Sequence, residues 1–326
     1  TFHTPASVNS RWSATPNERP AITFDPQTGK LAFPWLRPHL GKRPPFAPNH
    51  GGAPWLEPFH VREDGTKSTE PAKPGEQGPW SLCPEGAPRK HFNINAITLP
   101  ITLKQATAKT PAIVDPIGML YVLHEEEEEV RKNHKKQVPL VIRANVHDCV
   151  DVVYKNKVPD DARTGWANKI NLHPHFFQFD TSASDGPTIG FSYDMSLRAF
   201  TMLTDPAPDK GMPLPANSVL TADSKAGATS ITVSDASRYH VNTELGVGMD
   251  DAKNFEVARI KTIKGKTITF DRPLKFSHRK NDIASVEFIR ERWYLDVDLG
   301  TVYWHDHVFG TDTWGHGLFS ALITEP

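Results

Sequence analysis

The chain has 326 residues, and its 37 Lys and Arg against 38 Asp and Glu leave a formal charge of −1. This balance gives no field that would attract nucleic acid, and no apolar run reaches the ~18 residues of a membrane-spanning helix. We therefore expect no nucleic-acid partner and no membrane span. Proline accounts for 29 residues, nearly twice the usual ~5%, which favours turns, short strands and ordered loops over helices.

The first 90 residues have little hydrophobic periodicity. Residues 21–33 predict a hairpin around the turn Asp25-Pro-Gln-Thr-Gly29, and most of the remainder is rich in proline and glycine. We interpret 1–90 as a loop-rich extended segment. Two alternatives stay open, because such a segment either wraps over other domains or forms part of a neighbouring one. The chain starts at Thr1 without Met, which suggests a processed or shortened product.

A strand and then a helix are predicted next. Residues 91–103 alternate with period two, which is typical of a strand. Asp115 suits the N-cap of a helix and Pro116 its first position, and the helix would run to about Lys132.

The acidic run from Glu125 to Glu129 lies in this predicted helix. Five adjacent side chains point around all sides of a helix and do not converge on a metal ion. The pairs Glu127–Arg131 and Glu128–Lys132 have the i,i+4 spacing that stabilises a helix. We therefore expect a solvated linker helix without a binding role.

From about residue 138 the pattern indicates a β domain. Val150, Val152 and Tyr154 are spaced to share one face of a predicted strand. Further on, residues 215–288 contain short alternating strands at 230–233, 255–260 and 266–270, separated by turn residues. That pattern predicts a small all-β barrel or sandwich.

Two His-x-His pairs are the main chemical feature of the sequence: His173-Pro-His175, and His305-Asp-His307 directly after the predicted strand Gly300–Trp304. Residues i and i+2 of a strand share a face, so two such pairs on neighbouring strands would aim four imidazoles at one point. Imidazole binds zinc, copper, iron and nickel well. Pro174 cannot donate a ladder hydrogen bond, so its strand should be irregular or lie at a sheet edge.

The alternative is that these histidines are ordinary hydrogen-bonded or surface residues. The chain has 15 His, so two such pairs exceed chance only mildly. Their sequence context favours the metal site.

The two segments resemble the first and second copper-binding motifs of multicopper oxidases. In that family the first His-x-His precedes an Asp-Gly dipeptide, which here is Asp185-Gly186. The second follows a Gly-Thr-x-Trp/Tyr strand and precedes a Gly-Leu-x-Gly-x-Leu-Ile run, which here is 317–323 with Ser320 in the usual glycine place. Residues 140–156 resemble the opening strand pair of the family, with His147 replacing a glycine. The resemblance covers about 138–204 and 288–326.

The resemblance implies a cupredoxin-like Greek-key β-sandwich, mainly β with one short helix. Its two motifs are usually a few tens of residues apart, so 215–288 would be an inserted small β-barrel or sandwich module. The expected domains are then 1–90, a copper domain of 91–214 plus 289–326, and the insertion. Members of the family also lead us to expect a secreted, periplasmic or cell-surface location.

By resemblance, His173 would bind a type 2 copper, His175 and His305 one type 3 copper, and His307 the other. The family reduces O2 to water at a three-copper cluster held by eight histidines, and this chain supplies half of them. The remaining motifs and the type 1 copper would come from a second cupredoxin domain or subunit. Asp185 would lie near the cluster as a hydrogen-bonding residue, and Asp306 is at best another. His316 could be an extra ligand, but packing or a hydrogen bond is favoured.

The resemblance implies an oxidase that couples one-electron oxidation of a donor to O2 reduction. The donor would be a metal ion such as Mn(II), Fe(II) or Cu(I), or a phenol. The alternative is a non-catalytic copper-binding or structural module, because neither Cys83 nor Cys149 has the neighbours of a blue copper site. Whether these two cysteines pair with each other stays open. A mononuclear iron site is disfavoured, because its two-His-one-carboxylate set is missing.

Overall fold

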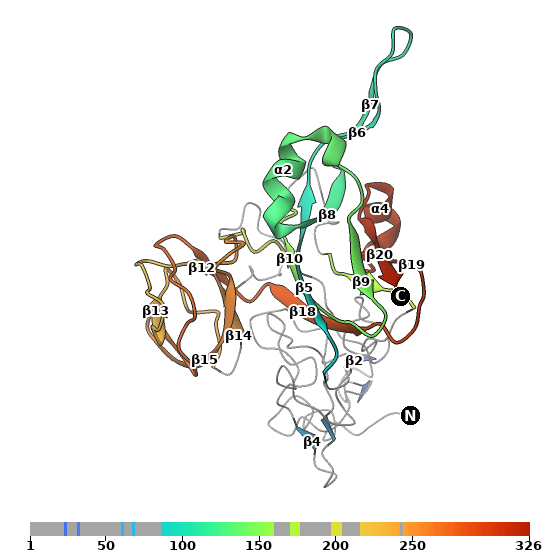
Figure 1. Ribbon diagram of the computed structural model, residues 1–326. Helices are drawn as coiled ribbons and strands as arrows, with labels where there is room; N and C mark the ends of the chain where they lie inside the picture. Colours follow the sequence, from blue (N-terminus) through green and yellow to red (C-terminus); the bar gives the residue numbers. More distant parts are fainter. Residues whose placement is uncertain are drawn as a thin grey trace.

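The computed structural model describes residues 86–159, 170–176, 197–203, 216–241 and 244–326, together with short strands at 23–24, 31–32, 60–61 and 67–68. Within these residues, two four-stranded sheets pack face to face around one hydrophobic core (Figure 1). The predicted mainly β, cupredoxin-like sandwich is therefore confirmed.

The first sheet has the order β18-β10-β5-β8. Its central strand β10 runs antiparallel to β18 and parallel to β5, so it is hydrogen-bonded on both edges. The strands are β5 (Arg89–Thr98), β8 (Met119–Leu123), β10 (Cys149–Asn156) and β18 (Phe288–Tyr294).

The second sheet has the order β11-β19-β20-β9, and β11 is its outermost described strand. It comprises β9 (Val141–Asn145), β11 (His173–Pro174), β19 (Thr301–His305) and β20 (Phe319–Glu325).

The core between the sheets is built from the alternation that the sequence predicted. Val150, Val152 and Tyr154 of β10 are all buried and point into it. They pack with two fully buried tryptophans, Trp293 of β18 and Trp304 of β19. Burying large aromatic side chains on folding is worth several kcal/mol each at about 25 cal/mol per Å², so this layer fixes how the two sheets face each other.

The helix predicted for 115–132 is wrong in its first half. Asp115 ends strand β7 and accepts a hydrogen bond from the Ile117 backbone N–H at 3.0 Å, which makes a turn. The apolar run that follows forms strand β8, which pairs antiparallel with β5 and is buried. Burial against β5 outweighs the local helix signals, because tertiary packing routinely overrides propensity.

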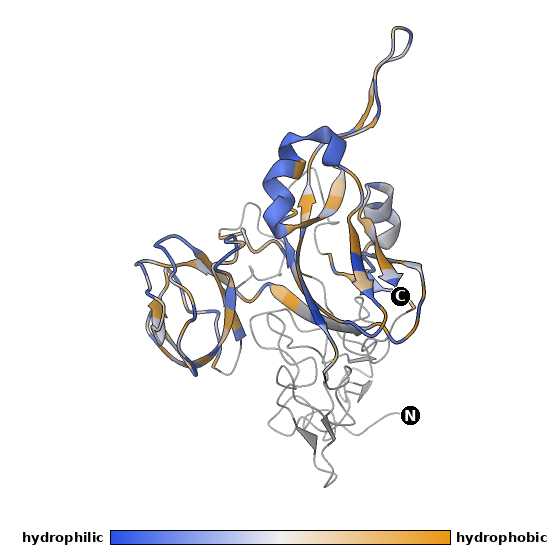
Figure 2. Cartoon of the chain, viewed as in Figure 1, coloured by the Kyte–Doolittle hydropathy of each residue, from blue (hydrophilic) through white to orange (hydrophobic). Residues whose placement is uncertain are grey.

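Helical structure starts only after β8. It comprises two 3₁₀ turns, η2 (His124–Glu126) and η3 (His134–Lys136), around α2 (Glu127–Lys132). A second short α-helix, α4 (Gly310–Gly315), precedes β20. In Figure 2, α2 has the hydrophilic colour along nearly its whole length. No helix among the described residues is long and apolar enough to cross a membrane.

The expected ion pairs of α2 are present, but one of its glutamates is not solvated. Arg131 bonds Glu127 at 2.9 Å, and Lys132 bonds Glu128. Glu127 is only 7% exposed and also accepts hydrogen bonds from Asn95 at 2.8 Å and Lys157 at 2.9 Å. The helix is therefore anchored to the sandwich by a paired carboxylate and does not act as a free linker.

His147 stands in the turn between β9 and β10 with a φ of 71°. This is the left-handed region, which glycine adopts most readily. His147 stands where the family that the sequence resembles has a glycine, and this backbone conformation explains the family's preference. The strained turn is held by the His147 N–H, which donates to the Leu295 carbonyl at 2.6 Å.

A separate six-stranded sheet occupies 217–285, with the order β12-β17-β14-β15-β16-β13 and its own hydrophobic cluster. In Figure 1 it lies to one side of the sandwich. The three strands expected here at 230–233, 255–260 and 266–270 are present. The strands are β12 (Asn217–Val219), β13 (Ser230–Thr232), β14 (Glu244–Val247), β15 (Glu256–Lys264), β16 (Thr267–Phe270) and β17 (Ile283–Ser285).

Three two-stranded hairpins complete the described strands. The predicted hairpin of 21–33 is present as β1 (Thr23–Phe24) and β2 (Leu31–Ala32), which pair antiparallel. The hairpin of β6 (Ile101–Lys104) and β7 (Ile113–Asp115) projects from the sandwich (Figure 1). The third consists of β3 (His60–Val61) and β4 (Lys67–Ser68).

Cys149, at the start of β10, is disulfide-bonded. The sequence has one other cysteine, Cys83, which lies outside the described residues. The sulfur of Cys149 is therefore not a thiolate and does not serve as a metal ligand.

The six-stranded sheet is joined to the sandwich by a buried lysine. Lys155, at 0% exposure, donates to the Met249 carbonyl at 2.9 Å and to His124 Nδ1 at 2.6 Å. His124 Nε2 in turn lies 3.2 Å from the Asp250 carbonyl, and Lys157 bonds the Asp250 carboxylate at 2.7 Å. The turn after β14 is thus held by three side chains of the sandwich and η2.

Burial at this junction changes the titration of both bases. Burial, aided by the charge of Lys155, lowers the pKa of His124 to about 4. Burial lowers the pKa of Lys155 to about 7. Both shifts favour the uncharged form, because the low-polarity surroundings disfavour a cation.

The first prediction concerns the acid stability of the chain. His124 takes up a proton near pH 6.5 when unfolded but only near pH 4 when folded. Its contribution to the unfolding free energy is therefore complete above pH 6.5 and is lost as the pH falls toward 4. Between pH 7 and 4, the wild type should lose on the order of 2 kcal/mol more unfolding free energy than His124→Gln. Urea unfolding at each pH measures this.

The matched control is His134→Gln, because His134 is exposed on η3. It should keep the pH dependence of the wild type. A difference between wild type and His124→Gln that does not change with pH would contradict the assignment.

Candidate metal centre

The site is built on the pairing of β11 with β19. The two strands are antiparallel, with His173 opposite His305 and Pro174 opposite Trp304. The His175 N–H continues the pairing by donating to the Tyr303 carbonyl at 3.1 Å. Among the described residues, Pro174 lies on a strand at one end of the sheet, which agrees with the predicted edge position.

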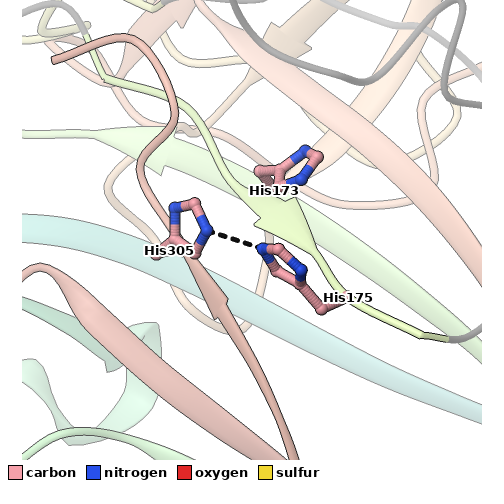
Figure 3. Close-up of side chains that lie close together, drawn as sticks. All are labelled: His173, His175 and His305. Atoms are coloured by element: carbon pink, nitrogen blue, oxygen red, sulfur yellow. Dashed lines mark hydrogen bonds between the residues drawn. The ribbon is translucent and has the colours of Figure 1, made fainter. Parts of the chain in front are cut away.

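The structure brings all four predicted histidines together. The ring centroid of His173 lies 4.8 Å from that of His175, 5.3 Å from that of His305 and 4.2 Å from that of His307. One ring nitrogen from each of His173, His175 and His305 can be chosen so that all lie within 4.8 Å of one another. Figure 3 shows these three side chains converging from the two strands.

The closest approach is between His175 and His305, whose Nε2 atoms are 2.7 Å apart (Figure 3). The other nitrogen of His305, Nδ1, lies 2.8 Å from the Asp306 carbonyl, which fixes Nδ1 as the protonated nitrogen. Burial, together with the neighbouring His175 and His307, lowers the pKa of His305 to about 4. His305 is therefore neutral near pH 7 and presents the lone pair of Nε2 to His175.

His307 lies beyond the end of β19, so strand geometry alone does not place it. Its backbone N–H donates to the side-chain oxygen of Asn171 at 2.7 Å. The backbone N–H of Asn171 donates to the Asp306 carboxylate at 2.9 Å. These two bonds connect the segment before His173 to the turn that carries His307.

Aromatic side chains surround the histidines. Tyr303 stacks on His175 with centroids 4.2 Å apart, and Trp314 of α4 meets the ring of His305 edge-on at 4.3 Å. Tyr303 is 48% exposed and Phe176 is 71% exposed. The outer face of the sheet, which carries the histidines, is thus apolar and open beside them.

The remaining predicted site residues are His316, Asp185 and Asp306. His316 bonds the Asp115 carboxylate at 2.7 Å, which matches the expected hydrogen bond. Asp185 lies outside the described residues. Asp306 is fully buried, and its carboxylate accepts hydrogen bonds from backbone N–H groups and from Thr313.

Sequence reasoning did not find three residues that shape the site: Asn171, Tyr303 and Trp314. Tyr303 and Asn171 each lie two residues before a predicted histidine, so the strand period would have placed them on the same face. No local pattern indicated Trp314, because its contact depends on how α4 folds back over β19.

No protein-family model matches the chain, and no curated protein matches it. Among solved structures it is similar to a multi-copper oxidase from Pseudomonas thermotolerans, with 12% identity over 74% of this chain and a TM-score of 0.33. It is also similar to a laccase from Botrytis aclada (12% identity over 74%, TM-score 0.30) and to the multicopper oxidase Fet3p, which functions in iron import (11% over 73%, 0.29).

The chain spans 30%, 23% and 23% of the lengths of these three proteins. Identities and TM-scores this low establish neither the family nor an activity. The functional argument therefore rests on the residues of the site.

The second prediction tests the histidine group directly. His175→Ala or His305→Ala should weaken Cu(II) binding to the full chain at least about tenfold, or about 1.4 kcal/mol, because each removes one converging nitrogen. Calorimetric titration with Cu(II) measures the affinity.

The control is His316→Ala, since His316 is paired with Asp115 outside the group. The Cu(II) affinity of this variant should stay within about twofold of the wild-type affinity. Equal weakening by all three substitutions would mean that copper binds elsewhere or without a defined site.

Proposed function

We propose that this chain is part of a multicopper oxidase, in which it supplies two of the four histidine pairs of a three-copper cluster. The oxidase would couple one-electron oxidation of a donor, either a metal ion such as Mn(II), Fe(II) or Cu(I) or a phenol, to four-electron reduction of O2 to water. The observation that carries the proposal is the facing pair of ring nitrogens on His175 and His305, 2.7 Å apart, with His173 and His307 beside them.

The donor set fits copper. Imidazole serves both oxidation states that copper adopts, whereas magnesium and calcium prefer oxygen ligands. His173 would hold a type 2 copper, His175 and His305 one type 3 copper, and His307 the second. When bound, the copper ions would supply one-electron redox chemistry toward O2.

The chain's own residues hold these ligands in place. The Asp306 carbonyl fixes the tautomer of His305 through Nδ1, as outer hydrogen bonds commonly do for metal-binding histidines. Stacking of Tyr303 on His175 limits the rotation of that ring. His173 and His305 are buried to 8% and 3% exposure, which limits water on their side of the site.

A second cupredoxin domain or subunit is needed to complete the cluster. The open side of the site carries exposed apolar residues on adjacent strands, Tyr303 on β19, Phe319 on β20 and Val141 on β9, each 44–49% exposed. Tyr303 and Val141 both lie opposite Ala321 in the paired strands, so they share a face. We propose that this face receives the partner domain, which would also carry the type 1 copper.

We further propose that 91–214 plus 289–326 form the copper domain, that 215–288 is an insertion in it and that 1–90 is a separate extended segment. The disulfide at Cys149 supports a secreted, periplasmic or cell-surface location, because disulfides persist mainly in oxidising compartments.

A second candidate function is a non-catalytic copper-binding module. It is favoured by the absence of a thiolate among the described residues, since the one described cysteine is disulfide-bonded. A blue copper site requires such a thiolate for electron entry, so catalysis by this chain requires a partner.

The third prediction separates the two functions. The native polypeptide is isolated, and its mass, copper content and O2 uptake with Mn(II), Fe(II), Cu(I) and a phenol are measured on one sample. A mass well above 36.3 kDa, several coppers per chain and O2 uptake that His305→Ala abolishes would support the oxidase. Copper binding at the histidines without O2 uptake, in an assembly that lacks a blue copper site, would favour the binding module.

A further inference from the structure

The carboxylate of Asp306 is a buried hydrogen-bond acceptor beside the histidines. It is fully buried and accepts four hydrogen bonds, two on each oxygen. On Oδ1 the donors are the backbone N–H groups of Asn171 at 2.9 Å and Val308 at 3.2 Å. On Oδ2 they are the Phe309 N–H at 3.0 Å and the Thr313 hydroxyl at 2.8 Å.

These four bonds join two distant segments. Val308, Phe309 and Thr313 belong to the turn and helix that follow His307, whereas Asn171 precedes His173 by two residues. Asn171 returns the contact, because its side-chain oxygen accepts from the His307 N–H at 2.7 Å. Asn171 and Asp306 therefore each accept a backbone hydrogen bond from the segment that carries the other.

Asn171 is itself fixed from the core. It is 1% exposed, and its carbonyl accepts a hydrogen bond from the Tyr121 hydroxyl at 2.5 Å. The Asp306 carbonyl accepts a hydrogen bond from the Trp314 indole N–H of α4 at 2.6 Å, so Asp306 is also held by the helix that follows His307.

We propose that Asp306 and Asn171 are positioning residues that set the separation between the two histidine pairs, and hence the geometry of the metal ion bound there. The proposal rests on the proposed function of the histidines. The β11–β19 ladder places His173 opposite His305, but it ends before His307. The distance of His307 from His173 is therefore set by the bonds between Asn171 and the 306–309 turn.

The physical reason is that a buried carboxylate with four donors has no alternative arrangement of equal energy. Moving the turn that carries His307 would leave charged oxygen or backbone N–H groups unpaired away from water, which is strongly disfavoured. We call these hydrogen bonds between Asn171 and the 306–309 turn the cross-link. The cross-link thus allows only one relative placement of the two histidine pairs.

The test uses Asp306→Asn and Asn171→Ala in the full chain. An amide at 306 offers one acceptor oxygen and turns an N–H toward groups that also donate, and alanine at 171 removes the acceptor for His307. We expect both variants to change the g-values and copper hyperfine splitting of the Cu(II) EPR spectrum and to weaken Cu(II) binding about tenfold or more, the usual range for residues that orient ligands. If Asp306→Asn does not fold, the EPR spectrum and the Cu(II) affinity of Asn171→Ala alone test the proposal.

The matched control is Thr98→Val, which removes one side-chain to backbone hydrogen bond from β5 in the same sandwich. It should lower stability without changing the EPR spectrum, so a purely structural role is separated from positioning. Folded Asp306→Asn and Asn171→Ala variants with the wild-type spectrum and affinity would overturn the proposal.

A second readout needs no copper. Long-range 1H–15N NMR of the metal-free chain reports the tautomer and surroundings of each histidine ring. The signals of His173 and His307 should shift in Asn171→Ala and stay unchanged in Thr98→Val. If the wild type binds no copper at the histidines, the proposed function fails, and these NMR signals still decide whether the cross-link positions the rings.

Discussion

The antiparallel pairing of β11 with β19 is the constraint on which the site depends. It places His173 opposite His305 and His175 opposite Tyr303, and the pleat then directs all four side chains to one face. A shift of one residue would turn them to the other face. The register is held from within by Trp304, which is fully buried against Tyr121 and Trp293 in the core. Packing of the sandwich and convergence of the imidazoles are thus two consequences of one register.

The polar groups of Asp306 orient one imidazole and the backbone around it. The Asp306 carbonyl accepts a hydrogen bond from the Nδ1–H group of His305, and both oxygens of the Asp306 carboxylate accept hydrogen bonds from the chain itself. That carboxylate therefore organises the backbone around the site, whereas its neighbours in sequence supply the imidazoles. Side chains of the sandwich also fix a turn at the junction with the 217–285 sheet. There Lys155 bonds the Met249 carbonyl and Lys157 bonds the Asp250 carboxylate, both in the turn after β14.

Much of the site could be predicted from the sequence because its signals are local. The two-residue period of a strand puts His173 and His175 on the same face, and Pro174 indicates the sheet edge. The helix expected from Asp115 onward failed because pairing of Met119–Leu123 with β5 is a tertiary effect that capping residues do not reveal. The cross-link between Asn171 and Asp306 spans 135 positions, and side-chain to backbone bonds at that distance leave no periodic pattern. Glu127 was expected to be solvated for a similar reason, since its partners Asn95 and Lys157 lie on other strands.

The central claim is that a copper ion is held by imidazoles from both strands. X-ray absorption spectroscopy of the Cu(II)-loaded chain at the copper K-edge tests it most directly, because multiple scattering from imidazole rings is distinctive and sulfur ligands are readily separated from nitrogen. The account predicts imidazole scattering with no copper–sulfur contribution, reduced when either His175 or His305 is replaced. Scattering from oxygen alone, from sulfur, or from imidazoles that persists in both variants would contradict it.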